Sequence, residues 1–454
     1  MTFALFLLYV ALSYIHPGQI VPALAPLRVT YWVGMAGLAV AIASLLRRRV
    51  GWYANLQLCA LAVFTGVLSV SLMIAERWLG APIMAIQRFG PSLTIFMLAV
   101  CSVTSLRRLR IAAVFIIVLT LMLMVQAAAA YHLGYNTELF LANGTTESED
   151  LTADLDEEQL EVDAIDQDVG FVAADDDSRR PARIRALGSM NDPNDLAMGM
   201  IVALGLIGGA WRARLQPRNL LLMAAAGALV YGIYLTRSRG GALALVVVLW
   251  RIAASRFGRL PALALVVTLG AGLLVLDFGG RPLSTALDES ASERLVAWTE
   301  GLGMLKARPI FGVGYGQFLD HHTLTAHNAL VLCFAETGLL GCFFWVSLLV
   351  VTLLELQRLK NLAGDAPFDQ MARQWGEGLQ LALIGFIAAA FFLSRTFVPI
   401  LYLLIGLAAA LAAVARAADR SVPLPPLPAL AALVLACELG AIGIVYSIVK
   451  LQIA

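Results

Sequence analysis

The sequence has few charged residues: Asp, Glu, Lys and Arg make up 14% of its 454 residues, whereas 60% are hydrophobic. A soluble globular chain carries roughly a quarter charged residues and at most about half apolar ones. The shortage of charge excludes a soluble enzyme, a secreted disulfide scaffold and a disordered protein. Apolar runs of about 17–25 residues recur along the chain, which predicts an all-α, polytopic membrane protein rather than an outer-membrane barrel.

Cysteine and lysine are also scarce. The cysteines lie in or near apolar segments without the spacing of metal ligands, which predicts buried small side chains. They are Cys59, Cys101, Cys333, Cys342 and Cys437. The only lysines are Lys306, Lys360 and Lys450, so nearly all positive charge comes from arginine.

The apolar runs predict about 12–13 transmembrane helices within a single membrane domain spanning residues 1–454. The first run has no basic flank or small-x-small cleavage site, so we expect a membrane helix rather than a signal peptide. No internal repeat is visible, so an inverted-repeat transporter gains no support. The predicted helices cover 3–20, 28–46, 54–75, 89–106, 111–131, 195–211, 219–235, 240–255, 260–277, 327–352, 379–395, 397–415 and 429–448.

Basic residues gather in short loops that all fall on one side in this count of spans. Examples are Arg47-Arg48-Arg49, Arg107-Arg108-Leu109-Arg110 and the pair Arg416 and Arg420. Such loops mark the cytoplasm. The N-terminus is then cytoplasmic, and three regions are predicted to lie outside. These are an acidic loop over 132–194, a turn at 236–239 and a loop over 278–326 that carries candidate catalytic groups.

The segment 147–177 carries 14 acidic residues and no basic residue. Its low apolar content is typical of a mobile, solvated loop. An alternative interpretation is a flap that pairs with the basic residues of 179–185. In either case we expect the segment to affect rate or chain length rather than chemistry.

Two groups of arginines stand out among the outer-side residues. Arg237 and Arg239 lie in a turn followed by Gly240-Gly241, where guanidinium groups bind phosphate oxygens in bidentate fashion or anchor the chain at the interface. Arg294 and Trp298 share one face of a helix-like stretch. The glycine-rich run that follows contains Tyr315 and lacks the Lys-Ser/Thr of a nucleotide-binding loop.

Two further groups precede apolar spans. His327-Asn328 opens the 327–352 span, where the histidine is placed to exchange protons or the pair is placed to cap the helix. A metal site formed by His321, His322 and His327 is an alternative, although no carboxylate follows at ligand spacing. Glu336, further along the span, is predicted to face protein or water. The other group favours a turn and helix cap, with acceptor-sugar contact as the alternative. It comprises Asn191, Asp192, Pro193, Asn194 and Asp195.

In this order, these segments resemble the O-antigen ligase and polymerase superfamily of bacterial membrane glycosyl-transfer enzymes. The resemblance covers roughly residues 185–345 by motif and the whole chain by hydropathy. It implies a fold of the lipid-dependent (C-type) glycosyltransferase kind in the bacterial inner membrane, with the active site facing the periplasm. It also implies a donor glycan on undecaprenyl diphosphate, with no nucleotide sugar, cofactor, metal or nucleic-acid partner.

Matched residue by residue, the resemblance implies that Arg239, with Arg237, and Arg294 hold the diphosphate. His327 would act on the acceptor hydroxyl. The remaining candidate contacts with substrate are Asn328, Asn191, Asp192, Asn194, Trp298 and Tyr315.

The first functional hypothesis is a polymerase that joins lipid-linked repeat units of a surface polysaccharide or exopolysaccharide, with a flippase and a chain-length regulator as partners. The Asn191 to Asp195 turn favours it, because it looks like that of exopolysaccharide polymerases in the superfamily. The alternative is an O-antigen ligase that moves glycan to lipid A-core. A solute transporter is a third hypothesis, but it should place ionisable groups near mid-membrane at broken helices.

Overall fold

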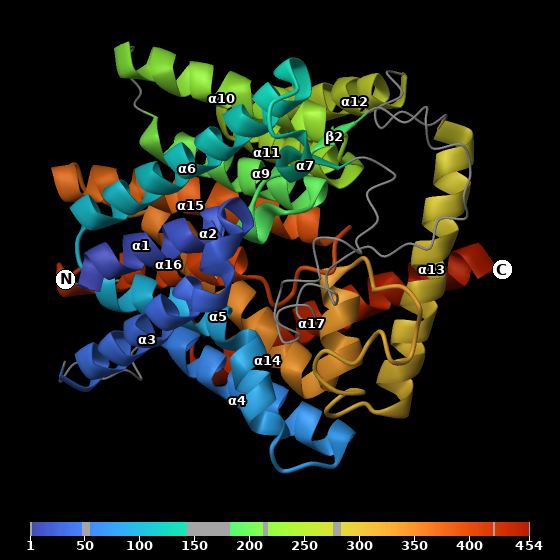
Figure 1. The fold of residues 1–454 in the computed structure, drawn as a ribbon. Coiled ribbons are helices and arrows are strands. Elements are labelled where there is room, and N and C mark those ends of the chain that lie inside the picture. The colour runs from blue at the N-terminus through green and yellow to red at the C-terminus, as the bar shows by residue number, and fades with distance from the viewer. Residues whose placement is uncertain are drawn as a thin grey trace.

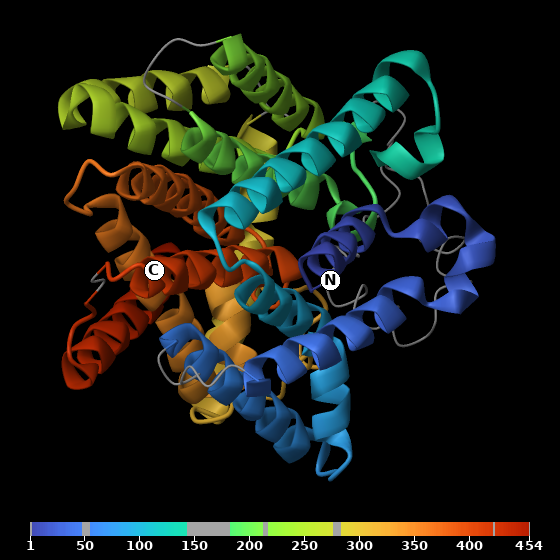
Figure 2. The same ribbon diagram turned by 90° about the vertical axis from the view of Figure 1, so that its left-hand side faces the viewer.

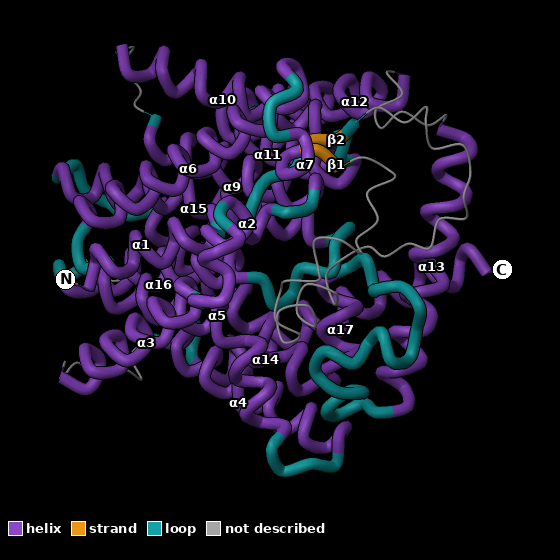
Figure 3. The backbone as a smooth tube through the Cα atoms, viewed as in Figure 1, coloured by secondary structure: helices purple, strands orange, loops and turns teal. Residues whose placement is uncertain are grey.

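The computed structural model describes residues 2–47, 55–142, 182–211, 217–275, 283–420 and 423–453. Within these ranges, helices dominate and one short antiparallel ribbon pairs β1 (Leu141–Ala142) with β2 (Arg183–Ile184) (Figure 3). The helices are α1 (Thr2–Ile15), α2 (Pro17–Ile20), η1 (Pro22–Leu27), α3 (Val29–Arg47), α4 (Leu56–Glu76), α5 (Ala81–Ser102), α6 (Leu106–Leu133), α7 (Thr137–Phe140), η4 (Gly188–Met190), α9 (Pro193–Ala210), α10 (Pro217–Thr236), α11 (Arg239–Phe257), α12 (Arg259–Val275), α13 (Leu283–Ala307), α14 (Ala329–Lys360), α15 (Pro367–Ala390), α16 (Pro399–Ala417) and α17 (Leu427–Ile453).

Nine helical segments of the described residues are long and apolar enough to cross a membrane. The predicted all-α, polytopic membrane fold is therefore confirmed. The remaining predicted spans overlap α1, α11, α12 and α15. The nine segments are Pro22–Leu46, α4, α5, α6, α9, α10, α14, α16 and α17.

Most of the long helices run roughly side by side, whereas α13 lies across them near the end of α17 (Figure 1). Figure 2 views the molecule from the side on which the N-terminus lies in Figure 1. The helix α13 packs against α14 and α17. It occupies the first part of the predicted outer loop over 278–326, so much of that loop is a surface helix.

The first two differences from the predicted helices occur at prolines. The predicted 3–20 helix is interrupted at His16, which has a positive φ of 44°. Pro17 explains this break, because proline disfavours the helical conformation in the residue before it. The helix α5 begins at Ala81 rather than at 89, with Pro82 in its first turn. Proline is well tolerated there because the first amides of a helix have no partner inside it.

The predicted 379–395 span is wrong at both ends. The helix α15 starts at Pro367 and finishes at Ala390. Its early start includes polar turns whose buried carboxylate, that of Asp369, binds Arg420. Residues 391–398 then form a non-helical connection to α16, which we call the α15–α16 linker.

Ion pairs join helix ends that the predicted topology places on the cytoplasmic side. The Glu355 carboxylate accepts hydrogen bonds from Arg416 at 2.8 Å and from Gln57 at 2.5 Å. Arg420 donates to both oxygens of Asp369, at 2.7 and 3.0 Å. These contacts bring together ends of α4, α14, α15 and α16, as an alternating topology requires.

Small residues allow α9 and α15 to approach closely. A Cβ atom on Gly205 would come within 2.3 Å of the Ala382 amide nitrogen, and one on Gly378 within 2.6 Å of the Gly209 Cα. Both helices therefore present small residues four positions apart to each other. This pattern is typical of membrane helices, whose association depends on close packing.

We expect Gly205→Leu to separate α9 from α15 and lower the stability of the purified protein in detergent. Overpacking of a tight contact costs about 1–3 kcal/mol or more. Gly227→Leu in α10 is the matched control, because a Cβ there meets no atom within 4 Å. Thermal unfolding should show a lower midpoint for Gly205→Leu alone, and equal midpoints would contradict the close-packing account.

Candidate active site

The α15–α16 linker contacts the two segments that carry Arg239 and Arg294, which are predicted to bind phosphate. The Arg294 guanidinium carbon of α13 lies 6.0 Å from the centre of the Phe392 ring. A Cβ on Gly240, the residue after Arg239, would lie 3.3 Å from the Phe392 Cβ. The start of α11 and one side of α13 therefore both contact the side chain of Phe392.

The same linker holds the backbone of His327. The His327 amide donates a hydrogen bond to the Ser394 hydroxyl oxygen at 2.8 Å, and this hydroxyl also bonds to Thr325. His327 has a positive φ of 47°, a conformation that a non-glycine residue adopts at some energetic cost. The His327 side chain is half-buried. Ser394 thus helps to fix a strained residue at the entrance to α14.

If His327 acts on an acceptor, as the resemblance implies, Ser394→Ala should lower turnover about tenfold while leaving donor binding unchanged, because one hydrogen bond contributes about 0.5–1.5 kcal/mol. A matched control is Ser347→Ala, whose hydroxyl donates only to Phe343 of its own helix among the described contacts. Separate measurement of donor affinity and transfer rate distinguishes the two effects. Equal rates for Ser394→Ala and the control would show that Ser394 does not position His327.

Asn328 forms the cap that was predicted for this position. Its side-chain oxygen accepts hydrogen bonds from the amides of Leu330 and Val331, at 2.9 and 3.1 Å. Its side-chain amide donates to the Phe391 carbonyl at 3.0 Å. The residue is fully buried. Asn328 consequently joins the start of α14 to the linker, and its contact with substrate stays a prediction.

Trp298 connects α13 to the residues just before His327. Its indole nitrogen donates to the Ala326 carbonyl at 3.0 Å, and its ring meets Phe391 edge-on at 5.7 Å. The side chain is buried. Arg294 and Trp298 therefore share one face of α13, as predicted, and both face the linker.

The turn before α9 forms a helix cap, as predicted. Asp192 is the cap residue and accepts from the Asn194 amide at 2.7 Å. The Asn194 side-chain oxygen accepts from the Ser238 hydroxyl at 2.8 Å and from Arg183 at 3.3 Å. Asn191 lies half-buried just before the cap. The start of α9 is thereby attached to the turn that carries Arg237 and Arg239.

Ser238 caps α11 between the two arginines of that turn. Its hydroxyl accepts from the Gly241 amide at 3.1 Å, and it is almost fully buried. Arg237 has a positive φ of 53°, and its guanidinium carbon lies 5.2 Å from the centre of the Tyr234 ring. Arg239 is the first residue of α11 and is half-buried. The cap thus fixes the backbone of both arginines.

The basic residues of 179–185 that the structure describes bind neighbouring backbone. Arg183 donates to the Thr236 carbonyl at 3.0 Å, and Arg185 donates to the Glu138 carbonyl at 2.8 Å. Burial lowers the pKa of the Arg185 guanidinium, and the Asp192 carboxylate acts in the opposite direction. The acidic segment 147–177 lies outside the described residues, so its proposed pairing with these arginines stays a prediction.

The sequence did not predict the ion pair that anchors the linker to α9. Arg395 donates to both oxygens of Asp195, at 2.5 and 2.9 Å, and is 5% exposed. Two parallel hydrogen bonds of this kind give a pair both strength and fixed geometry. The signal in the sequence was an arginine next to an apolar run, since a charged residue near the membrane core usually has a partner.

Glu336 organises the glycine-rich loop after α13. Its carboxylate accepts from the amides of Gly316 at 2.9 Å and Phe318 at 3.2 Å, and it is buried. The prediction that Glu336 faces protein is therefore confirmed. Tyr315 in this loop is also buried, with its ring 4.7 Å from that of Phe397. The structure thus places Tyr315 within the aromatic packing around the linker.

No group of three or more His, Cys, Asp or Glu side chains is arranged to hold a metal within the described ranges. His321 and His322 instead contact the backbone carbonyls of Gln317 and Leu324, at 3.0 and 2.9 Å. The alternative metal site of His321, His322 and His327 therefore gains no support from their placement.

Residues 223–346 match a family model described as O-antigen ligase. The match runs from within α10 into α14 and includes Arg237, Arg239, Arg294 and His327. The chain has no match among the curated proteins with which it was compared. Residues 223–346 are therefore similar to an O-antigen ligase domain, which confirms the resemblance expected from the motifs.

Proposed function

We propose that this protein transfers glycan from undecaprenyl diphosphate to an acceptor hydroxyl at the outer face of the bacterial inner membrane. Its specific reaction would be polymerisation of surface-polysaccharide or exopolysaccharide repeat units. The family match supports glycan transfer of the ligase or polymerase type. The observation that carries the proposal is the convergence on one linker, through Phe392 and Ser394, of the segments that bear Arg239, Arg294 and His327.

The proposed chemistry assigns charge and proton transfer to different side chains. The acceptor oxygen forms a bond to the anomeric carbon while the bond from that carbon to the diphosphate oxygen breaks. The lipid diphosphate leaves with the bonding electron pair, and Arg239 and Arg294 stabilise its negative charge with fixed positive charge. His327 accepts the proton of the acceptor hydroxyl.

Transfer by purified protein in liposomes tests the proposal. We expect undecaprenyl-diphosphate-linked repeat units, supplied alone, to give a ladder of longer lipid-linked glycans. A product that forms only after lipid A-core is added would instead support the ligase alternative. Failure to form a glycosidic bond with either acceptor, by folded protein, would contradict glycan transfer.

The proposed orientation, with α13 outside the cytoplasm, can be tested by labelling of introduced cysteines. We expect Glu300→Cys, on the exposed surface of α13, to react with a membrane-impermeant thiol reagent in intact spheroplasts. The matched control is Gln370→Cys, which is exposed near the start of α15 on the predicted cytoplasmic side and should react only after lysis. Both substitutions are made in a chain whose native cysteines are replaced. The reverse pattern of labelling would overturn the orientation.

A further inference from the structure

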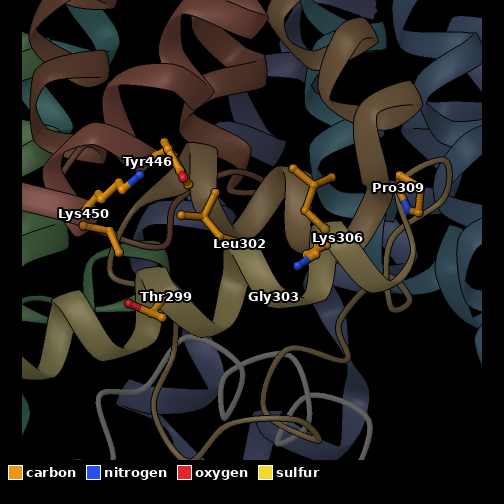
Figure 4. Close-up of a pocket in the computed structure, with 9 residues that line it drawn as sticks. Thr299, Leu302, Gly303, Lys306, Pro309, Tyr446 and Lys450 are labelled. Atoms are coloured by element: carbon orange, nitrogen blue, oxygen red, sulfur yellow. The ribbon is translucent and has the colours of Figure 1, made fainter. Parts of the chain in front are cut away.

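A groove of about 690 Å³ separates α13 from the last turns of α17 (Figure 4). Most of its wall is apolar, and none of its lining residues belongs to the group of Arg239, Arg294 and His327. The lining residues are Thr299, Leu302, Gly303, Leu305, Lys306, Pro309, Tyr446, Val449 and Lys450.

The charge of this groove is unusual for this chain. Two of the three lysines in the whole chain line the groove: Lys306 from α13 and Lys450 from α17. The Lys450 ammonium lies 5.8 Å from the centre of the Tyr446 ring. None of the described lining residues is acidic. The groove therefore combines an apolar wall with two ammonium groups, which is the complement of an anionic amphiphile.

We propose that this groove binds an anionic glycerophospholipid of the surrounding membrane. An acyl chain lies along the apolar wall formed by Leu302, Leu305 and Val449. Lys306 and Lys450 lie toward opposite ends of the groove (Figure 4), so the phosphate pairs with the ammonium group at one end while the other adds positive charge to the groove. Basic pockets beside membrane helices recognise anionic lipid headgroups in this way. Lysine suits a single phosphate that requires charge rather than bidentate geometry.

The lipid would brace the helix that presents Arg294. Trp298 and Gly301 of α13 face the linker and α14, since a Cβ on Gly301 would come within 2.5 Å of Val331. Thr299, Leu302 and Lys306 occupy the adjacent face, which lines the groove. Occupancy of the groove therefore adds contacts along the face of α13 next to the one that packs against the linker and α14. Binding itself does not depend on the proposed function.

Native mass spectrometry of the full-length protein in detergent tests the role of the lysines. We expect palmitoyl-oleoyl phosphatidylglycerol to bind more tightly than the phosphatidylcholine with the same acyl chains. Lys306→Gln together with Lys450→Gln should weaken phosphatidylglycerol binding about thirtyfold, because each lysine near an anionic headgroup contributes about 1 kcal/mol. Lys360→Gln is the matched control: the third lysine pairs with Glu377 at 3.9 Å outside the groove.

A second variant tests the apolar wall without changing charge. A Cβ on Gly303 meets no atom within 4 Å, so Gly303→Leu places its side chain in the groove without a clash in the core. We expect this variant to lose binding of both lipids. Gly440→Leu in α17 is the control, because its Cβ also meets no atom within 4 Å and it does not line the groove.

Three results would overturn the proposal. Equal phosphatidylglycerol affinity in the double lysine variant and the wild type would show that the lysines do not bind the lipid headgroup and only anchor the helices at the interface. Equal affinity of the wild type for the two lipids would remove selectivity for the phosphate charge. Tighter binding of undecaprenyl phosphate than of phosphatidylglycerol, lost in the double variant, would assign the groove to the carrier lipid.

Discussion

His327→Ala should lower turnover about a hundredfold or more while leaving the affinity for the lipid-linked donor nearly unchanged. Loss of a general base typically slows a reaction by about 10²–10⁴-fold. The residue stands at the start of α14, and its amide is held by Ser394 at 2.8 Å. Transfer from a purified lipid-linked glycan measures turnover, and donor binding is measured separately on the same protein.

His322→Ala is the control for this substitution, since His322 is a half-buried histidine in the same loop whose ring nitrogen lies 2.9 Å from the Leu324 carbonyl oxygen. We expect it to retain close to wild-type turnover. If His327→Ala abolished donor binding, His327 would be a phosphate ligand rather than a base. Activity that a chelator removes would revive the histidine metal site.

Arg239→Lys and Arg294→Lys should each impair transfer although both keep the positive charge. Lysine cannot supply the two parallel hydrogen bonds with which a guanidinium binds phosphate. Each lost charge-assisted contact costs about 1.5–3 kcal/mol, or roughly ten- to a hundredfold in rate or affinity. The double variant should lose the larger part of its activity. Measurement of donor affinity and single-turnover rate assigns the loss to binding or to the transition state.

Arg308→Lys is the matched control for the arginines, because Arg308 follows α13 directly and its exposed side chain is directed to the Val313 carbonyl at 3.5 Å. It should transfer glycan at the wild-type rate. Wild-type turnover in the double variant of Arg239 and Arg294 would contradict the proposed diphosphate site. Both arginines would then only anchor the chain at the membrane interface.

The helices were predictable because apolar runs and their flanking basic loops are local features of the sequence. The α15–α16 linker was not, because the apolar residues after Ala390 continue the hydropathy of α15. What separates them from the helix is tertiary contact: Ser394 bonds the His327 amide, and Arg395 pairs with Asp195. Neither partner is near the linker in the sequence, so no local pattern contains this information.

In the candidate site, too, local features were predictable from the sequence and long-range contacts were not. Sequence patterns predicted the caps formed by Asp192 and Asn328 because a cap depends on residues two or three positions away. They gave no sign that Trp298 and Tyr315 pack against linker aromatics rather than facing open space. An aromatic side chain suits either environment, and only the packing of distant segments decides between them.

The most direct test is the stoichiometry of lipid product and glycosidic bond in liposomes that contain the purified protein, undecaprenyl-diphosphate-linked glycan and a chelator. The proposed reaction releases one undecaprenyl diphosphate for each bond formed, and His327→Ala slows both products equally. Bond formation without release of the lipid diphosphate, or unchanged release by the variant with His327→Ala, Arg239→Lys and Arg294→Lys, would contradict glycan transfer at this site.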